Sequence, residues 1–257
     1  SHLIKKKFSK FDFIFARNVI AHLNDPNKVF SGIENLLKEN GVFILEVPHL
    51  LNILKENQYD NIFHEHIGFH SLRSIKDLCE QHNLRVFDVK RIDSQGGSLR
   101  CFICKKKSRR VISKKTKKIL SIEKKLRLFS KKNLEKFNLK IKKHSKKMYQ
   151  LIYNLKKKKN KISIYGASGK GQALMQFAKI DNKLIDYVFD KSKLKQGRFT
   201  PGTNIKIVDP KYISRKNVDY LIILSWNIKD EIIKQEKVFF RKGGKFILPF
   251  PTPRIVN

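Results

Sequence analysis

The sequence has few cysteines, few acidic residues and no long apolar run. Its 257 residues include three cysteines, which are too few for a disulfide framework. No apolar run reaches the roughly 18 residues of a membrane-spanning helix, and no signal peptide opens the chain. These absences argue against a disulfide-stabilised secreted protein and against an integral membrane protein. We therefore expect a globular protein of the reducing cytoplasm, cut from something longer.

Cys101 and Cys104 have the C-x-x-C spacing found in many metal and redox sites. They lie in the alternating run L-R-C-F-I-C, where an odd separation points two side chains to opposite faces of a strand. We therefore expect both cysteines to be structural.

Acidic residues are scarce, because 22 Asp and Glu face 57 Lys and Arg and give a formal net charge of +35. Residues 105–161 hold 25 of these basic residues and only 2 of the acidic ones. The flanking regions carry no zinc-finger, RNA-recognition or helix-turn-helix signature, and lysine outnumbers the arginine expected for base readout. We expect no specific nucleic-acid partner, and charge-driven binding through the lysine block stays as an alternative.

Apolar side chains recur at helical spacing within residues 109–160, where the other positions are mostly lysine. The apolar positions are Ile119, Ile122, Leu126, Phe129, Leu134, Phe137, Ile141, Met148, Ile152 and Leu155. One apolar stripe opposite a basic face predicts a long helix, continuous or broken, that packs between domains. A helix on a membrane surface or on nucleic acid is the alternative.

The region before the basic segment predicts a strand, a helix and a second strand. Residues 11–16 and 41–47 are apolar runs, and the helix between them begins at Asp25-Pro26, with Asp25 as N-cap. Apolar runs without alternation predict a parallel sheet that is covered on both faces. The region continues with a helix and two strands, at residues 71–83, 84–89 and 98–104.

Strands and helices alternate again from Ile162, with strands in the runs I-S-I-Y, I-D-Y-V-F-D, V-D-Y-L-I-I-L and K-F-I-L-P-F. This alternation predicts a second doubly wound sheet. The predicted fold is α/β, with two Rossmann-like doubly wound sheets, the first incomplete, joined by a long basic helical segment. The expected domains are residues 1–104, a helical linker at 105–160 and a carboxyl-terminal domain at 161–257.

Residues 59–70, Y-D-N-I-F-H-E-H-I-G-F-H, gather imidazoles and a carboxylate within a few positions. These residues are His64, Glu65, His66 and His70. Histidine exchanges protons near neutrality, and a carboxylate can hold its ring in one tautomer. In an extended segment His64 and His66 would share a face, and His22 adds an imidazole at the end of the first predicted strand. The pattern favours an acid–base site over the alternative, a metal site, because no further ligand is spaced to complete one.

A glycine-rich turn, G-A-S-G-K-G at residues 166–171, follows a predicted strand and opens a helix. Backbone N–H groups and a helix N-terminus can bind phosphate there, which predicts a site for a nucleotide diphosphate. The spacing fits neither a Walker A loop nor G-x-G-x-x-G, and a tight strand-to-helix turn is the alternative. Asp190, after the next strand, is placed to hold a ribose or to cap a loop.

Seven motifs, in this order, resemble those of one family. They are A-R-N-V-I-A-H, L-E-V-P-H-L, F-H-E-H-I-G-F-H-S-L, G-G-S-L-R, Y-G-A-S-G-K-G, K-Q-G-R-F-T-P-G-T and L-S-W-N. The series is similar to that of the sugar C-methyltransferases, S-adenosylmethionine-dependent enzymes that methylate C3 of nucleotide-linked 4-keto deoxysugars. The resemblance runs over nearly the whole chain. It implies this activity, with a nucleotide-linked keto sugar as substrate.

The family architecture, as the resemblance implies it, is a small zinc-binding domain, a class I methyltransferase domain and a Rossmann-like carboxyl-terminal domain. The chain carries neither the zinc-binding domain nor the glycine-rich S-adenosylmethionine loop, so zinc is expected only in the absent domain. Residues 1–104 would be the second half of the methyltransferase domain, with residues 11–16 and 42–47 as its fourth and fifth strands. We expect a fragment whose partner is the missing amino-terminal half. A non-catalytic nucleotide-sugar-binding remnant or scaffold is the alternative.

The resemblance also implies roles for single residues. His66 matches the base that removes the C3 proton, Glu65 its partner, and His22 a second imidazole that faces the enolate oxygen. Ala16 and Asn18 would edge the methyl-donor pocket. The residues that would approach the nucleotide or the sugar are Phe63, His64, Gly166, Ser168, Gly169 and Lys170. No metal ligand is expected in this chain.

Overall fold

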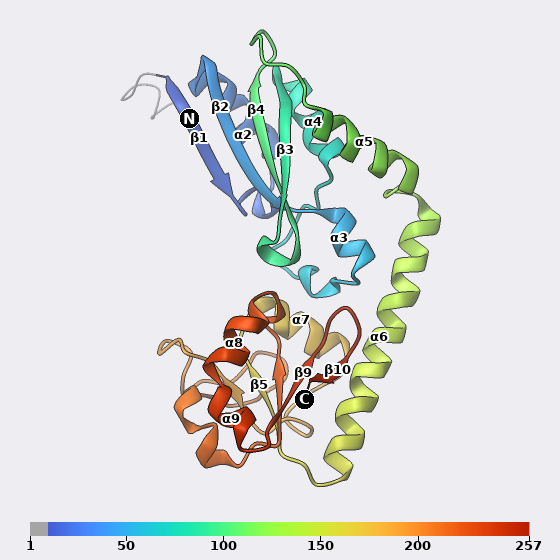
Figure 1. The fold of residues 1–257 in the computed structure, drawn as a ribbon, viewed down its shortest axis with the longest axis vertical. Helices are drawn as coiled ribbons and strands as arrows, with labels where there is room; N and C mark the ends of the chain where they lie inside the picture. Colours follow the sequence, from blue (N-terminus) through green and yellow to red (C-terminus); the bar gives the residue numbers. More distant parts are fainter. Residues whose placement is uncertain (1–9, 257) are drawn as a thin grey trace. The chain divides into compact units, whose positions relative to one another are not determined.

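A computed structural model describes residues 10–256, which divide into two compact units. The first unit comprises Ser1–Lys55 and His64–Leu134, and the second comprises Glu56–Phe63 and Glu135–Asn257. Each unit has its own sheet (Figure 1). Within residues 10–256 no helix combines the length and the apolar character needed to cross a membrane.

The first sheet has four strands in the order β1-β2-β4-β3. They are β1 (Phe11–Arg17), β2 (Leu37–Pro48), β3 (Leu84–Ile92) and β4 (Ser98–Lys105). β1 and β2 are parallel, as predicted, whereas β4 runs antiparallel to both β2 and β3. Gly96 and Gly97, both with positive φ, lie in the turn that joins β3 to β4.

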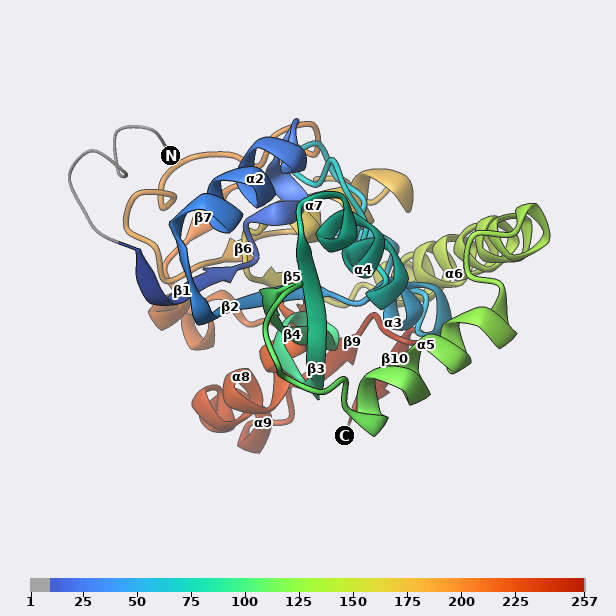
Figure 2. The same cartoon turned by 90° about the horizontal axis from the view of Figure 1, so that it is seen from above.

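The described residues of the first unit form four α-helices. They are α2 (Pro26–Leu36), α3 (Leu50–Lys55), α4 (Leu72–Gln81) and α5 (Lys114–Leu126). Asp25 caps α2 by accepting a hydrogen bond from the Lys28 N–H at 3.3 Å, as expected, and Ser71 forms a capping box with Ser74 at the start of α4. Figure 2 shows α2 and α4 on the same side of the first sheet.

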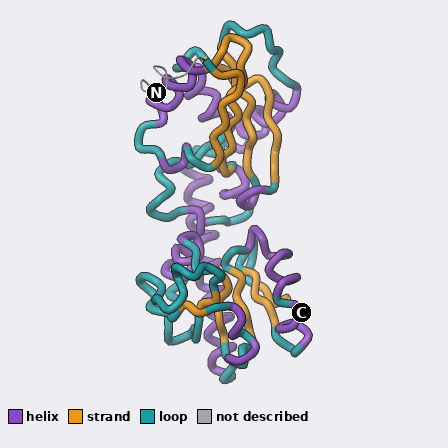
Figure 3. The backbone as a smooth tube through the Cα atoms, turned by 90° about the vertical axis from the view of Figure 1, so that its left-hand side faces the viewer, coloured by secondary structure: helices purple, strands orange, loops and turns teal. Residues whose placement is uncertain are grey.

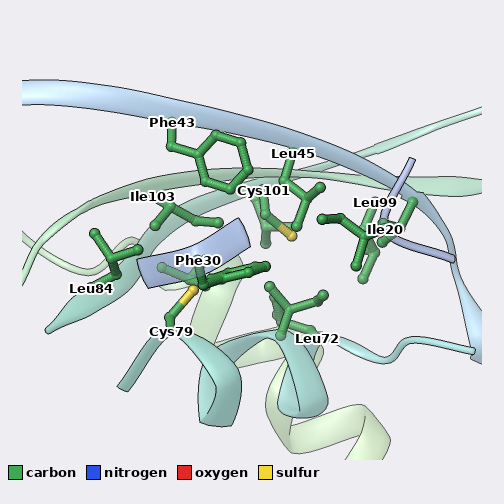
Figure 4. Close-up of a cluster of buried hydrophobic side chains, with 14 of the residues drawn as sticks. Ile20, Phe30, Phe43, Leu45, Leu72, Cys79, Leu84, Leu99, Cys101 and Ile103 are labelled. Atoms are coloured by element: carbon green, nitrogen blue, oxygen red, sulfur yellow. The ribbon is translucent and has the colours of Figure 1, made fainter. Parts of the chain in front are cut away.

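The core of the first unit lies between this sheet and these helices (Figure 4). Its members include Phe30, Phe43, Leu45, Leu72, Cys101 and Ile103, each fully buried. Burial raises the pKa of the Cys79 and Cys101 thiols, so both are neutral at physiological pH. The cysteines therefore pack as small apolar side chains, as expected.

The expectation of a sheet covered on both faces is wrong for β1. Ile14 and Ala16 pack against the core, but the alternate residues Phe13 and Phe15 are 71% and 57% exposed. Side chains alternate along a strand, so Phe11, Phe13 and Phe15 give β1 a second apolar face opposite Ile14 and Ala16. In residues 10–256 β1 pairs with β2 alone, and the helices of this unit pack on the opposite face.

The second sheet has the order β10-β9-β8-β5-β6-β7, drawn in orange in Figure 3. Its strands are β5 (Ile162–Tyr165), β6 (Val188–Phe189), β7 (Ile207–Val208), β8 (Tyr220–Ile223), β9 (Lys245–Leu248) and β10 (Arg254–Val256). All neighbours are parallel except β9 and β10. The mixed α/β architecture with two Rossmann-like sheets is thus confirmed.

Both faces of the second sheet are covered. Tyr165 and Leu221 pack with residues of α8 (Lys229–Gln235) and α9 (Lys237–Arg241), including Phe239. Ile164 and Ile222 alternate with them to the opposite face and are also fully buried. The remaining helices of this unit are α7 (Gly169–Phe177) and most of α6 (Lys131–Lys157).

The basic segment forms two helices, α5 and α6, rather than one. Arg127, at the end of α5, has a left-handed backbone with φ 45° that ends the helix. Most of the predicted apolar positions of α6 are buried, namely Phe137, Ile141, Met148, Ile152 and Leu155, whereas Leu134 in its first turn is 49% exposed. Its lysines therefore lie on the solvated side.

Candidate active site

The imidazole rings of His22 and His66 contact each other in the first unit. Their centroids are 4.9 Å apart, and the ring planes cross at 68°. His22 ends the short 3-10 turn Ile20–His22 after β1, and His66 lies in the loop before α4. His22 is exposed and His66 is partly exposed, so a substrate can reach both rings. Imidazole is the side chain suited to proton transfer near neutrality.

Backbone hydrogen bonds hold the two histidines together. The Ala21 carbonyl accepts from the Ile67 N–H at 2.8 Å and from the Gly68 N–H at 3.0 Å. These bonds tie the loop that carries His66 to the turn that carries His22. The pairing therefore depends on backbone geometry close to both rings rather than on a salt bridge.

His70 adds a side-chain tie between the same two segments. Its ring interacts with the backbone of Ile20, which belongs to the turn that carries His22. Burial lowers the pKa of the half-buried His70, so the ring is neutral at pH 7 and serves as a positioning group. The sequence pattern counted His70 among the histidines for chemistry, but the structure gives it this supporting position.

A buried carboxylate, that of Glu123, anchors the end of the loop that carries His66 and His70. Glu123 of α5 is 4% exposed and accepts from the Leu72 N–H at 2.8 Å and the Arg73 N–H at 2.9 Å, at the start of α4. It also lies 2.7 Å from the His49 Nε2. His49 forms a parallel backbone bridge with His70. The sequence signal for this residue is that Glu123 is one of only two acidic residues in residues 105–161.

The expected arrangement of His64, Glu65 and His66 is wrong in one respect. Residues 64–65 form a turn rather than an extended segment, so His64 and His66 do not share a strand face. His64 Nε2 lies 3.8 Å from Glu65 Oε1, with side chains that are 84% and 58% exposed. The structure thus places Glu65 beside His64, and His66 beside His22.

Ala16 and Asn18 lie at the carboxyl end of β1. Asn18 adopts φ 52°, and its N–H donates to the Glu46 carbonyl at 2.9 Å. Its side-chain oxygen is buried and has no hydrogen-bond partner in the part of the chain that the structure describes. A ligand that donates a hydrogen bond would satisfy this oxygen. The Glu46 carboxylate beside it is buried and paired with Arg17 and Arg100.

The glycines of residues 166–171 allow close packing in the second unit. Gly166 has φ 97°, and a Cβ there would lie 2.5 Å from the Ser225 Oγ. A Cβ at Gly169 would lie 3.2 Å from the ring of Phe63. Close packing therefore accounts for glycine at positions 166 and 169 without a bound phosphate. This agrees with the alternative named above, a tight strand-to-helix turn.

The polar groups of the same turn are engaged within the protein. Ser168 caps α7 by accepting from the Gly171 N–H at 3.1 Å. Asp190 accepts from the Ala167 N–H at 2.8 Å and from the Ser192 N–H at 2.8 Å. Of the two roles expected for Asp190, the loop cap is the one with these contacts.

Lys170 lies near a buried carboxylate that the sequence pattern did not single out. Asp60 is 1% exposed and accepts from the Trp226 Nε1–H at 2.7 Å. Burial raises the pKa of Asp60 to about 6, although the Trp226 hydrogen bond and the Lys170 charge oppose this. Burial also lowers the pKa of Lys170, against the attraction of Asp60. Two of the quoted motifs contain Asp60 and Trp226, but only the fold pairs them.

Tyr59 anchors the start of the histidine motif in the second unit. Its hydroxyl is 3.2 Å from the His144 Nδ1, and its ring packs against Phe177 and Phe250 at 5.4 and 5.5 Å. His144 in turn lies 2.7 Å, through Nε2, from the Pro249 carbonyl. Residues 59–63 therefore serve the packing of the second unit, and residues 64–70 belong to the first.

Within residues 10–256 no group of three or more His, Cys, Asp and Glu side chains is arranged to hold a metal ion. The candidate residues therefore fall into an imidazole pair in the first unit and a glycine turn with Lys170 in the second.

Comparison with known proteins matches nearly the whole chain. Residues 93–251 match the family described as the C-methyltransferase C-terminal domain, and residues 2–89 match the family described as a methyltransferase domain. The chain is 33% identical over 244 residues to the C-methyltransferase NovU of Streptomyces niveus. That alignment covers 95% of this chain and 58% of NovU, so the chain spans somewhat more than half the length of this relative.

Proposed function

Because the chain belongs to the C-methyltransferase family, we propose that it takes part in S-adenosylmethionine-dependent C-methylation of a nucleotide-linked 4-keto deoxysugar. It would act as one part of the full enzyme, since its match covers 58% of NovU. The observation that carries the proposal is the contact between the accessible rings of His22 and His66. A paired base and proton donor is what this reaction requires of the protein.

The chemistry begins with a proton on carbon. A ketone at C4 acidifies the C3 hydrogen, and a base removes it when the developing enolate oxygen is stabilised. His66 takes this proton in the proposal, and His22, with its ring centroid 4.9 Å away, donates to the enolate oxygen. Glu65 is the proposed partner of the base, and its carboxylate also lies 3.8 Å from the His64 Nε2.

The methyl donor belongs beside the end of β1. S-adenosylmethionine, when bound, supplies an electrophilic methyl group. Ala16 and Asn18 would hold one edge of it, and they fit this role because the buried side-chain oxygen of Asn18 has no partner in residues 10–256. The glycine-rich loop that would complete this pocket has no counterpart in the sequence.

The second unit would bind the nucleotide-linked sugar. Phe63, Gly166, Ser168, Gly169 and Lys170 gather around the start of α7, and His64 follows Phe63 in the chain. We assign residues 1–104 to the second half of a methyltransferase domain and residues 161–257 to a sugar-nucleotide-binding domain, linked by residues 105–160. Because Asp60 already attracts Lys170, Lys170 would add less positive charge for phosphate than a lone lysine.

Methyl transfer provides the test. The assay measures transfer of a labelled methyl group to a nucleotide-linked 4-keto deoxysugar by the chain combined with a polypeptide that supplies a glycine-rich S-adenosylmethionine loop. His66→Ala should lower kcat by about 100-fold or more, because general-base catalysis contributes about that much. His82→Ala is the matched control, since His82 bonds to Asn27 away from the pair. Transfer by His66→Ala within tenfold of wild type would remove His66 as the base.

A non-catalytic nucleotide-sugar-binding module is the competing function. The chain by itself should bind S-adenosylmethionine weakly, because only one edge of the pocket is present. Calorimetry measures this directly, and tight binding to the chain alone contradicts the expectation. If the combined protein binds the nucleotide sugar but never methylates it, the module is the correct reading.

A further inference from the structure

A cavity in the second unit lies away from every residue assigned above. It has a volume of about 520 Å³, within the range of about 300 to 1,000 Å³ typical of small-molecule sites. Its lining includes residues at the starts of β5, β6 and β7, for example Lys161, Tyr187 and Lys206, and Lys216 of the 3-10 turn that precedes β8. The three strands are parallel, so their starts share the amino edge of the sheet.

The glycine turn lies at the other edge of the same sheet. Residues 166–171 and Asp190 follow the carboxyl ends of β5 and β6. The four residues of β5 separate the two edges by roughly 13 Å at about 3.3 Å per residue. The cavity at the amino edge is therefore distinct from the proposed sugar-nucleotide site.

The charge of the lining favours an anion. Four cations, Lys161, Lys206, Arg215 and Lys216, face one carboxylate, that of Asp186. Asp186 is already paired, at 2.7 Å from the Lys156 ammonium. Among the described residues no carboxylate forms an ion pair with any of the four lining cations. An anionic ligand would supply the missing counter-charge.

The uncharged lining is suited to an aromatic ring with a polar edge. Tyr187 and Phe199 both line the cavity, and Phe199 is 57% exposed. Asn182, Asn204 and Asn217 add amide groups that both donate and accept hydrogen bonds. Aromatic side chains stack on nucleobases, and amides read their edges.

A buried hydroxyl in the lining gives independent support. Ser163 is fully buried, and within residues 10–256 its Oγ has no hydrogen-bond partner. Most buried polar side chains are hydrogen-bonded, so an exception in the lining of a cavity indicates a group that a ligand or its bound water satisfies. We propose that this cavity binds a nucleoside phosphate, with the cations on the phosphates and the aromatic side chains on the base.

Calorimetry with adenosine 5′-diphosphate, pyrophosphate and adenosine tests the proposal on the whole chain. Adenosine diphosphate should bind most tightly, pyrophosphate at least tenfold more weakly, and adenosine least, because the site needs both charge and ring. Lys206→Ala combined with Arg215→Ala should weaken binding of the diphosphate at least tenfold. Phe199→Ala should weaken binding of the diphosphate but not of pyrophosphate.

One control separates this site from general charge. Lys234→Ala combined with Lys237→Ala removes the same charge from exposed positions of α8 and α9 and should leave the affinity within twofold. Equal losses in both double variants, or no binding at millimolar nucleotide, would each overturn the proposal.

Discussion

Single residues in this protein take their chemistry from partners distant in sequence. Asp60 and Trp226 are 166 positions apart, yet the indole N–H donates to the carboxylate at 2.7 Å. His22 and His66 come from two loops that share the Ala21 carbonyl as acceptor. The residue types in a motif therefore indicate the kind of chemistry that is possible. The contacts made on folding decide which side chains act together.

Trp226 should report the ionisation of Asp60. It is the only tryptophan in the chain, so its fluorescence is an unambiguous probe. The emission should change with a midpoint near pH 6, because burial raises the pKa of Asp60 to about 6. Asp60→Asn should abolish this transition, and Asp190→Asn should keep it. A midpoint near pH 4, or one that survives in Asp60→Asn, would contradict the assignment.

The same ionisation should affect stability. Between pH 3.8 and about 6 the folded state binds the Asp60 proton more tightly than the unfolded state, so the free energy of unfolding falls as pH rises. A shift of about 2 pK units corresponds to about 3 kcal/mol at most. Urea unfolding followed through Trp226 should show wild type losing stability relative to Asp60→Asn across this range. If the free energies of unfolding of wild type and Asp60→Asn change in parallel with pH, this prediction is wrong.

Elements of the first unit depend on a helix from the lysine-rich segment. Glu123 of α5 accepts two backbone N–H groups at the start of α4 and pairs with His49. A carboxylate at a helix N-terminus is favoured by the helix dipole and by the free N–H groups there. The segment that composition described as a solvated basic helix thus also contributes a buried acidic contact.

Glu123→Ala should destabilise the first unit by roughly 3 kcal/mol, because it removes the acceptor of the Leu72 and Arg73 N–H groups and of the buried His49 ring, at about 1 to 3 kcal/mol for each unsatisfied group. Glu123→Gln should cost less, since the amide oxygen still accepts a hydrogen bond. Glu135→Ala is the matched control, because Glu135 is the other acidic residue of residues 105–161 and is exposed. Urea unfolding followed by circular dichroism measures all three variants. Equal stabilities of Glu123→Ala and Glu135→Ala would refute the role.

The two faces of the first sheet should respond differently to substitution. Phe43→Ala on β2 should cost about 3 to 5 kcal/mol, because Phe43 is fully buried in the core. Phe15→Ala on β1 should change the free energy of unfolding by about 0.5 kcal/mol or less, since that side chain is 57% exposed. A large loss on Phe15→Ala would show that its face is covered after all.

The whole molecule is strongly cationic, with a formal net charge of +35. The sequence gives no base-reading motif, and its lysines are spread along α5 and α6 on exposed positions. A field of this kind attracts polyanions without recognising them. The net charge therefore bears on solubility and on non-specific association, and it says nothing about the chemistry of the site.

Duplex DNA should bind the chain only through this charge. At low salt the affinity should be equal for two duplexes of unrelated sequence, and it should fall steeply as salt rises. Fluorescence anisotropy over a salt series measures both effects. Preference for one duplex that persists at physiological salt would instead support a nucleic-acid function.

The sequence by itself determined most of the strands and helices, the two sheets, the cap at Asp25 and the family, but not α3, β7 or β10. These features follow from local periodicity, cap chemistry and ordered motifs, which the chain carries in short stretches. Predictions failed where side chains depend on distant partners. The turn at residues 64–65 separated His64 from His66, and Phe13 and Phe15 proved exposed.

Only the tertiary structure decided which groups meet. It paired His22 with His66, Asp60 with Trp226, and Glu123 with His49. It also brought the starts of three parallel strands and the turn at residues 214–216 together around a cationic cavity. The physical reason is that such contacts need loop closures over tens of residues and alternate faces of a sheet, and neither is encoded in local spacing.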